Sequence, residues 1–203
     1  MVRVKVCGIT SLADARLCIA AGVDALGLNF WPRSVRRCGE ETARELVREL
    51  AGQVLFVGVF VDERPEEIAR LIEHVGLGCV QLHGDETPAV LERFLPHAYK
   101  AVRVRDQDVL ALTRTFPGEH ILLDAYVPGM PGGTGAVFDW QLAHAVARER
   151  KLTLAGGLTP SNVAAAVQAV RPYCVDTASG VESAPGVKDE RLVRAFVDQA
   201  RAA

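Results

Sequence analysis

The chain has 203 residues, with 23 basic and 25 acidic side chains and a formal net charge of -2 at pH 7. This balance offers no cationic surface to a nucleic-acid backbone and no basic block to a membrane, so we expect neither kind of partner. The sequence has no run of about 18 apolar residues, and no leader precedes the first strand pattern, which predicts a soluble and unprocessed protein.

The five cysteines are odd in number and lack CxxC spacing. This pattern predicts neither a disulfide framework nor a zinc site, and it is typical of a reducing compartment, so we expect the chain in the cytoplasm. A chain of this length buries enough surface for one hydrophobic core. We therefore expect residues 1–203 to form a single domain.

Short apolar runs alternate with helical patterns along the chain. Strands are predicted at 2–7, 25–30, 54–61, 79–83, 98–104, 120–125, 152–156 and 173–178. Helices are predicted at 11–21, 40–51, 65–75, 87–94, 106–115, 138–150, 160–170 and 189–201. Eight strands alternating with eight helices are typical of an α/β fold of the compact (β/α)8 TIM-barrel type. A doubly wound sheet, which more often has about five or six strands, stays open as the alternative.

Capping residues mark several of these helix starts. Ser11 and Asp189 precede the first and last predicted helices as N-caps, and Pro88 and Pro160 occupy first-turn positions of two others. Proline fits there because the N–H that it lacks has no helical partner in the first turn. These residues predict where four of the helices begin.

Alternation within the strands predicts which side chains point into the barrel. In the first strand, Val4 and Val6 should face the surrounding helices, which leaves Lys5 and Cys7 facing the axis. Asp124 ends the sixth strand with the same inward phase. Three further polar residues are predicted to face inward: Gln81, His83 and Asp176. Because active sites of these barrels lie at the carboxyl ends of the strands, Cys7 and Asp124 are the candidate base and acid.

A thiol is an uncommon base, because only a few per cent of it is ionised at neutral pH at its ordinary pKa. Useful basicity needs a nearby positive charge, and Lys5 lies about 7 Å below Cys7 along the strand. Lys5 should help modestly unless an interior carboxylate already pairs with it. An inert thiol at Cys7, an Asp124 that caps the next loop, and a His83 that is only an interior hydrogen-bonded residue stay open as alternatives.

Two loops predict an anion site. Gly156 and Gly157 lie between the seventh strand and its helix, and Ser179 and Gly180 follow the eighth strand. Glycine lets backbone N–H groups approach an anion, and a following helix start adds a favourable dipole. Loops at these two places form the recurrent phosphate site of such barrels, so we expect a phosphate here. A plain tight turn at the two glycines is the alternative.

Arg36 follows the second strand, where it would lie at the mouth of the barrel. A guanidinium can hold a carboxylate through two parallel hydrogen bonds. Charge alone instead favours a solvated surface arginine at this position.

The glycine-rich stretch at 127–135, directly after Asp124, predicts either a mobile lid over the acid or an ordinary loose loop.

Taken together, the motifs resemble those of one enzyme family. They are KVCGIT (5–10), GLNFWPRSVR (27–36), VGVF (57–60), VQLHGDE (80–86), LLD (122–124), GGTGAVFDW (132–140), LAGGLTPSNV (154–163), VDTASGVES (175–183) and GVKD (186–189). In this order, and over nearly the whole chain, they resemble the phosphoribosylanthranilate isomerase family. That family consists of (β/α)8 barrels of tryptophan biosynthesis.

The resemblance implies an Amadori rearrangement of N-(5-phosphoribosyl)anthranilate, an aminoaldose, to an aminoketose. Cys7 would remove the proton from ribose C2, and Asp124 would protonate the furanose ring oxygen as the ring opens. Arg36 would hold the anthranilate carboxylate, and Asp176 would orient the amine. The backbone around four residues would hold the phosphate: Gly156, Gly157, Ser179 and Gly180.

Two positions depart from the family pattern, since Val35 stands where Pro is common and Ala178 where a second Ser is common. The loop after the second strand is therefore expected to be less rigid, and one phosphate hydroxyl to be absent. No cofactor is implied, because hydrogen moves within one molecule. The expected partner is a small phosphorylated substrate, with the chain a monomer or a homodimer. Another phosphate-binding barrel isomerase, or such a barrel without catalysis, stays open as the alternative.

Overall fold

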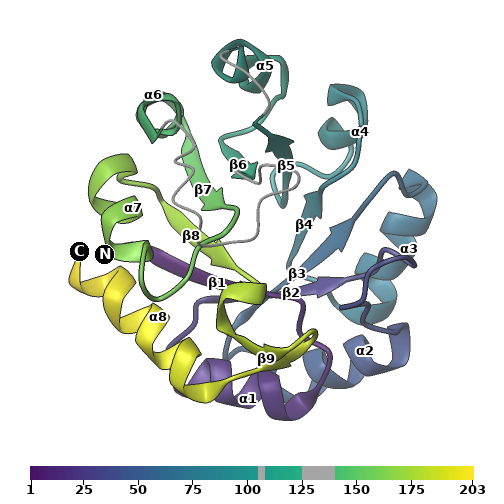
Figure 1. Ribbon diagram of the computed structural model, residues 1–203. Helices are drawn as coiled ribbons and strands as arrows, with labels where there is room; N and C mark the ends of the chain where they lie inside the picture. Colours follow the sequence, from purple (N-terminus) through teal and green to yellow (C-terminus); the bar gives the residue numbers. More distant parts are fainter. Residues whose placement is uncertain (105–107, 125–139) are drawn as a thin grey trace.

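The computed structural model describes residues 1–104, 108–124 and 140–203. Eight of its strands lie parallel and pair in chain order, and β8 pairs back with β1, so that the sheet closes into a barrel (Figure 1). The helices surround this barrel on its outside. The closed sheet confirms the predicted (β/α)8 fold and excludes the doubly wound sheet.

The observed elements lie within a few residues of those predicted. The barrel strands are β1 (Arg3–Cys7), β2 (Ala25–Asn29), β3 (Leu55–Phe60), β4 (Cys79–Leu82), β5 (Ala98–Arg103), β6 (His120–Asp124), β7 (Lys151–Ala155) and β8 (Cys174–Thr177). The helices of the described ranges are α1 (Leu12–Ala20), α2 (Glu40–Glu49), α3 (Pro65–Val75), α4 (Pro88–Glu92), α5 (Val109–Thr115), α6 (Trp140–Glu149), α7 (Val163–Val170) and α8 (Glu190–Ala202). The starts predicted at 106 and 138 and the glycine-rich stretch at 127–135 lie outside the described residues.

None of the helices within the described ranges is both long and apolar enough to cross a membrane.

Three of the predicted helix starts are confirmed. Ser11 caps α1 by accepting a hydrogen bond from the Asp14 N–H, and Asp189 caps α8 in the same way. Pro88 occupies the first turn of α4.

The start predicted for α7 at Pro160 is wrong, because the helix begins at Val163. Asn162 explains the difference. Its side-chain oxygen accepts a hydrogen bond from the Thr159 N–H at 2.8 Å, and its side-chain amide donates to the Gly157 carbonyl at 3.0 Å. These bonds hold a turn ahead of the helix, and asparagine commonly forms such turns with its own neighbouring backbone.

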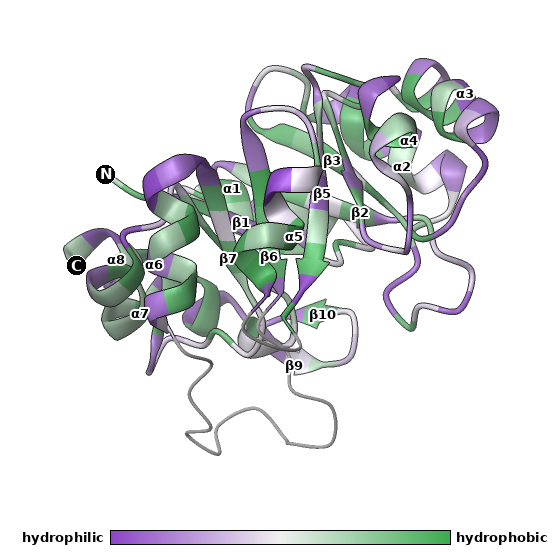
Figure 2. Ribbon diagram, turned by 90° about the horizontal axis from the view of Figure 1, so that it is seen from above, coloured by the Kyte–Doolittle hydropathy of each residue, from purple (hydrophilic) through white to green (hydrophobic). Residues whose placement is uncertain are grey.

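One small element was not predicted. After β8 come a 3-10 turn, η1 (Ser179–Val181), and a hairpin of β9 (Glu182–Ala184) and β10 (Val187–Lys188). Strands of two and three residues are too short to show an alternation pattern. The hairpin lies at the carboxyl ends of the barrel strands (Figure 2), which is the end where Cys7 and Asp124 lie.

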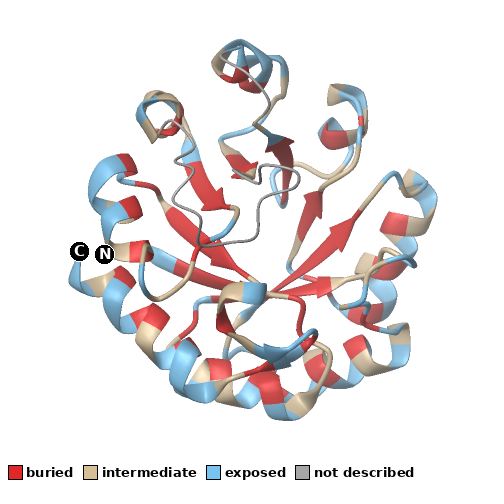
Figure 3. Cartoon of the chain, viewed as in Figure 1, coloured by how far each residue is buried: buried red, intermediate tan, exposed pale blue. Residues whose placement is uncertain are grey.

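Alternation along the strands divides the core in two, as predicted. Val4 and Val6 belong to the large apolar cluster between the strands and the helices. Figure 3 shows the strands buried and the outer faces of the helices exposed. A second cluster inside the barrel consists of Ala25, Val57, Tyr99, Ala101, Leu122 and Ala155. Buried polar side chains share the interior: Lys5, Gln81, Thr153 and Asp176.

Lys5 and Asp176 form a buried ion pair. They lie opposite each other on the neighbouring strands β1 and β8, with Nζ 2.6 Å from Oδ2 and side chains only 2% and 6% exposed. Burial by itself disfavours the ammonium, but Asp176, together with Cys7 and Tyr99, outweighs it and raises the pKa of Lys5 well above its ordinary value. The inward orientation of both side chains is confirmed, and Lys5 is already paired with an interior carboxylate.

Replacing Lys5 with Met should lower the free energy of unfolding by about 3–5 kcal/mol, because the Asp176 carboxylate is then buried without its partner. The double variant Lys5→Met/Asp176→Leu should recover much of that loss. Urea denaturation followed by circular dichroism measures both. Arg194→Met, which breaks an exposed ion pair with Glu190 on α8, is the control and should change stability little. A loss in Lys5→Met as small as in the control contradicts the prediction.

Candidate active site

Cys7 and Asp124 lie at the same mouth of the barrel. Cys7 ends β1 and Asp124 ends β6, and each is half-buried. The buried Asp176 of β8 interacts electrostatically with both Cys7 and Asp124. The structure therefore brings together the predicted base, the predicted acid and the predicted inward carboxylate.

The Cys7 thiol has a tight and partly cationic environment. Gly27 lies opposite Cys7 on β2, and a Cβ there would lie 2.7 Å from Sγ, so glycine makes room for the sulfur. Burial raises the pKa of the thiol above its usual value, and Lys5 and Lys188 oppose this rise without overcoming it. Burial thus disfavours the thiolate in the free protein, and Lys5 is not the only cation near it, because Lys188 and Arg36 also interact with Cys7.

Lys188 was not predicted as a site residue. Its ammonium is fully buried, and it donates to the Cys7 carbonyl at 2.7 Å, to the Ala178 carbonyl at 3.2 Å and to Glu182 Oε1 at 2.7 Å. No alternation pattern identifies it, because β10 has two residues. The signal in the sequence is its place in GVKD, directly before the helix cap Asp189.

Arg36 is held in place by Glu182, a residue that was not predicted either. Nε and Nη2 of Arg36 donate to the Glu182 carboxylate at 2.6 to 3.1 Å, so the solvated surface arginine is excluded. Burial opposes ionisation of Glu182, but Arg36 and Lys188 outweigh it and hold the pKa of this carboxyl below its usual range. Two cations around one anion leave a net positive cluster, which suits an anionic group of a ligand.

Gly8 seats Arg36 next to the candidate base. The residue directly follows Cys7 and has a φ of 77°, in the left-handed region that favours glycine. A Cβ on Gly8 would lie 2.6 Å from Cδ of Arg36. The aliphatic part of the Arg36 side chain therefore passes directly over the backbone at the end of β1. This places Arg36 at the mouth of the barrel, as predicted.

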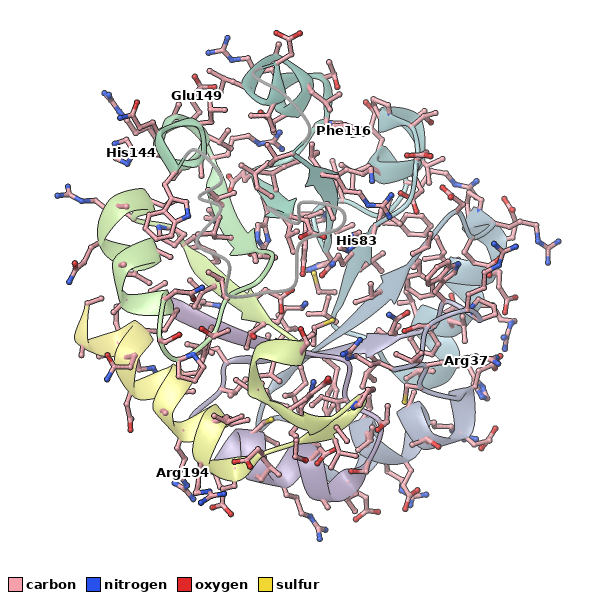
Figure 4. All side chains as sticks on the ribbon, viewed as in Figure 1. Arg37, His83, Phe116, His144, Glu149 and Arg194 are labelled. Carbon is pink, nitrogen blue, oxygen red and sulfur yellow. The ribbon has the colours of Figure 1, made fainter. Side chains whose placement is uncertain are left out.

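His83 contacts the candidate acid. Its Nε2 lies 3.2 Å from Oδ2 of Asp124, and its Nδ1 lies 2.8 Å from the side-chain nitrogen of Gln81. Figure 4 shows His83 near the centre of the barrel in the view along its axis. The inward orientation of Gln81 and His83 is confirmed. His83 is hydrogen-bonded within the barrel, and one of its partners is Asp124.

The glycines after β7 have the backbone freedom that the phosphate prediction requires. Gly156 and Gly157 have φ angles of 96° and 65°, both in the left-handed region. A Cβ at Gly157 would meet no atom within 4 Å, so this part of the loop faces open space. A plain tight turn stays open as the alternative, because such φ angles also occur in turns.

The loops after β7 and β8 are joined to each other. The Thr177 hydroxyl donates to the Leu158 carbonyl at 2.8 Å, and Gly180 packs so closely that a Cβ would lie 2.0 Å from the same oxygen. Ser179 is exposed at the start of η1. The four residues predicted to bind phosphate therefore lie on two loops that are in direct contact.

A closed parallel barrel with ionisable groups gathered at the carboxyl ends of its strands defines the class of (β/α)8-barrel enzymes. Within that class, a family model described as N-(5'phosphoribosyl)anthranilate (PRA) isomerase matches residues 4–199. The chain belongs to this family, as the motifs predicted.

Relatives and solved structures agree over the full length. An N-(5'-phosphoribosyl)anthranilate isomerase from Desulforudis audaxviator is 47% identical over 205 residues, which covers 100% of both chains. The crystal structure of phosphoribosyl anthranilate isomerase from Thermotoga maritima has a TM-score of 0.91 and 42% identity, and a structure in complex with reduced 1-(o-carboxyphenylamino)-1-deoxyribulose 5-phosphate has 0.87 and 40%. Both matches cover 100% of each chain.

Alkylation of Cys7 by iodoacetamide should be slow at neutral pH and should accelerate as the pH rises above the ordinary pKa of a thiol, because burial raises the pKa of Cys7. Lys188→Met removes one opposing cation, so its alkylation profile should lie at still higher pH. Mass spectrometry of the peptide that contains Cys7 measures the rate, and circular dichroism checks the fold of the variant. A rate that is already maximal at pH 7 contradicts the prediction.

Proposed function

We propose that this chain converts N-(5-phosphoribosyl)anthranilate to 1-(2-carboxyphenylamino)-1-deoxyribulose 5-phosphate, with Asp124 as general acid and Cys7 as general base. The observation that carries these roles is a carboxyl and a thiol group at the ends of β6 and β1 that both interact with the same buried carboxylate, Asp176. Family membership supports the isomerase activity and the substrate. A solved relative that binds the reduced form of the product adds support.

Asp124 begins the reaction on the closed ring of the substrate. Its proton passes to the ring oxygen as the bond between that oxygen and C1 breaks. The lone pair of the anthranilate nitrogen then forms a C1=N bond, which leaves an iminium cation. Acid participation of this kind contributes on the order of 100-fold to 10,000-fold.

Cys7 completes the hydrogen shift. Once the thiol has released its own proton to water, the thiolate takes the proton from C2, and the electron pair of that C–H bond forms a C1=C2 bond and neutralises the iminium. The resulting enolamine tautomerises to the ketone at C2, so that no atom is gained or lost. Because burial raises the pKa of Cys7, the adjacent iminium has a second use: its positive charge favours the thiolate at the step that needs it.

The two ends of the substrate require anchors of different kinds. Arg36 is proposed to hold the anthranilate carboxylate, and the net positive charge of its cluster with Glu182 and Lys188 supports this. The phosphate is proposed to lie against the joined loops after β7 and β8, around Gly156, Gly157, Ser179 and Gly180. Fixing both ends holds C1 and C2 between the acid and the base.

Asp176 is proposed to orient the amine of the substrate. Its Oδ2 accepts from Lys5, whereas its buried Oδ1 has no hydrogen-bond partner within the part of the chain that the structure describes. A buried acceptor without a partner costs about 1–3 kcal/mol. A hydrogen bond donated by the anthranilate N–H would remove that cost, and it would place the nitrogen next to the acid and the base.

The proposal needs no cofactor and no second subunit, because all the proposed groups belong to one chain that acts as a single catalytic domain over residues 1–203. A monomer or a homodimer fits it equally. Nucleic acid is not a proposed partner, in line with the net charge of -2. All five cysteines, which lie at described positions, are unpaired, and this supports the cytoplasm as the proposed location.

Cys7→Ala and Asp124→Asn should each reduce kcat by about 100-fold to 10,000-fold, because each removes one proton-transfer group. The purified chain is supplied with phosphoribosylanthranilate, without added cofactor, and the loss of anthranilate-type fluorescence is followed. Affinity for the reduced product analogue should stay close to that of the unaltered chain. Cys79→Ala, at a cysteine at the start of β4, is the control and should keep its activity. No turnover by the unaltered chain rejects the function, and full turnover by either variant removes that residue from the mechanism.

Arg36→Met should raise KM more than it lowers kcat, because it removes an anchor of the substrate rather than a reacting group. Initial rates over a range of substrate concentrations separate the two constants. Arg37→Met, next along the chain, is the matched control. An unchanged KM in Arg36→Met would refute the carboxylate anchor.

A further inference from the structure

A chain of hydrogen bonds runs from the barrel interior to the carboxyl group of Asp124. The Tyr99 hydroxyl donates to the side-chain oxygen of Gln81 at 2.9 Å, the Gln81 nitrogen lies 2.8 Å from Nδ1 of His83, and Nε2 of His83 lies 3.2 Å from Oδ2 of Asp124. Tyr99 and Gln81 are only 2% and 1% exposed, so water does not compete for these partners. The chain is therefore a fixed feature of the interior.

The chemistry of the groups determines which group donates and which accepts at each step of these hydrogen bonds. Because Tyr99 engages the oxygen of Gln81, the Gln81 nitrogen faces His83, and an amide nitrogen only donates. Nδ1 of His83 must then accept, so the ring proton is on Nε2, which faces Asp124. An imidazolium would turn a second N–H toward the Gln81 nitrogen and set two donors against each other. Gln81 thus selects the neutral Nε2–H form of His83.

We propose that His83 is a positioning residue for the general acid: its Nε2–H, oriented by Gln81, donates to Oδ2 of Asp124 and fixes the orientation of this carboxyl group. This inference rests on the proposed role of Asp124. When Asp124 gives up its proton, the carboxylate that forms already has a donor in place, so no reorganisation is needed in the transition state.

Other charged groups surround this pair. Asp176 of β8 interacts with both His83 and Asp124, and Lys5 neutralises Asp176 from below. Arg103 lies opposite Asp124 in the register of β5 and β6, and it donates to the His83 carbonyl rather than to the ring. Of the groups that the structure describes around the ring, Gln81 is the partner of Nδ1, so it decides which nitrogen carries the proton.

The backbone at His83 is held without the help of its side chain. The His83 N–H donates to the Phe60 carbonyl at 2.7 Å, and the Lys100 ammonium donates to the Gly84 carbonyl at 2.6 Å. Lys100 also forms a buried ion pair with Glu86 at 3.1 Å. Changes of the imidazole should therefore leave the loop in place, so their effects report on Asp124.

The experiment compares His83→Ala with His83→Gln and His83→Asn in the turnover assay. His83→Ala should lower kcat about 10- to 100-fold with little change in KM, because a hydrogen bond to a charged group is lost. His83→Gln can still donate from the position of Nε2 and should recover much of the rate, whereas His83→Asn should not. His144→Ala, on the outer helix α6 (Figure 4), is the control and should match the unaltered chain.

Two further readouts separate positioning from mere structure. A hydrogen bond donated to a carboxylate favours its ionised form, so one limb of the kcat profile of His83→Ala should move to higher pH. In the unaltered chain, 15N NMR should show the His83 proton on Nε2, and Gln81→Glu should move it to Nδ1. The NMR result does not depend on turnover, so it tests the inference even if the chain lacks the proposed activity.

The inference is overturned by an Nδ1-protonated His83 in the unaltered chain. It is also overturned if His83→Ala keeps its rate, or if His83→Ala and His83→Gln lose it equally with an unchanged pH profile. Absence of turnover by the unaltered chain instead rejects the proposed function. The two failures are therefore distinct.

Discussion

The mouth of the barrel depends on the buried ion pair between Lys5 and Asp176. It joins two residues 171 positions apart, at the seam where the last strand meets the first. Asp176 interacts with both Cys7 and Asp124, so one buried carboxylate faces both the proposed base and the proposed acid. If Lys5 did not neutralise it, a buried negative charge would oppose both the thiolate and the second carboxylate. Closure of the sheet and the chemistry at its mouth thus use the same contact.

The charges at the mouth are paired before any ligand arrives. Glu182 forms ion pairs with both Arg36 and Lys188 and so orients both side chains. The side chain of Glu182 is only 4% exposed. Asp124 is in contact with His83 in the same way. Cations and acids that are already oriented lose little conformational freedom when they bind a substrate, which is the physical basis of preorganised sites. The hairpin β9–β10 contributes two of these groups although it is outside the barrel.

The sequence predicts those features that follow from local periodicity. Val4 and Val6 must meet the helices, and a period of two then turns Lys5 and Cys7 inward, so both orientations could be predicted. Arg36 and Glu182 are 146 positions apart, and no local pattern relates them. The pairing of these two side chains depends on how the strands close into a ring. The contact between His83 and Asp124, 41 positions apart, was beyond reach for the same reason, although each side chain was correctly turned inward.

Side-chain chemistry accounts for the one predicted helix start that was wrong. Pro160 is suited to a first helical turn. The side-chain amide of Asn162, however, bonds to the backbone of Thr159 and Gly157, so α7 begins only at Val163. Propensity gives the average preference of a residue, whereas this turn depends on one specific pair of hydrogen bonds.

The contact between Thr177 and Leu158 ties together two segments that would otherwise be independent. Gly180 packs against the same carbonyl. The loops after β7 and β8 are therefore joined, and one loop cannot move without moving the other. Substitutions in one of these two loops therefore affect which substitutions the other loop tolerates. A bulkier residue at position 180 would be tolerated only with a compensating change around Leu158.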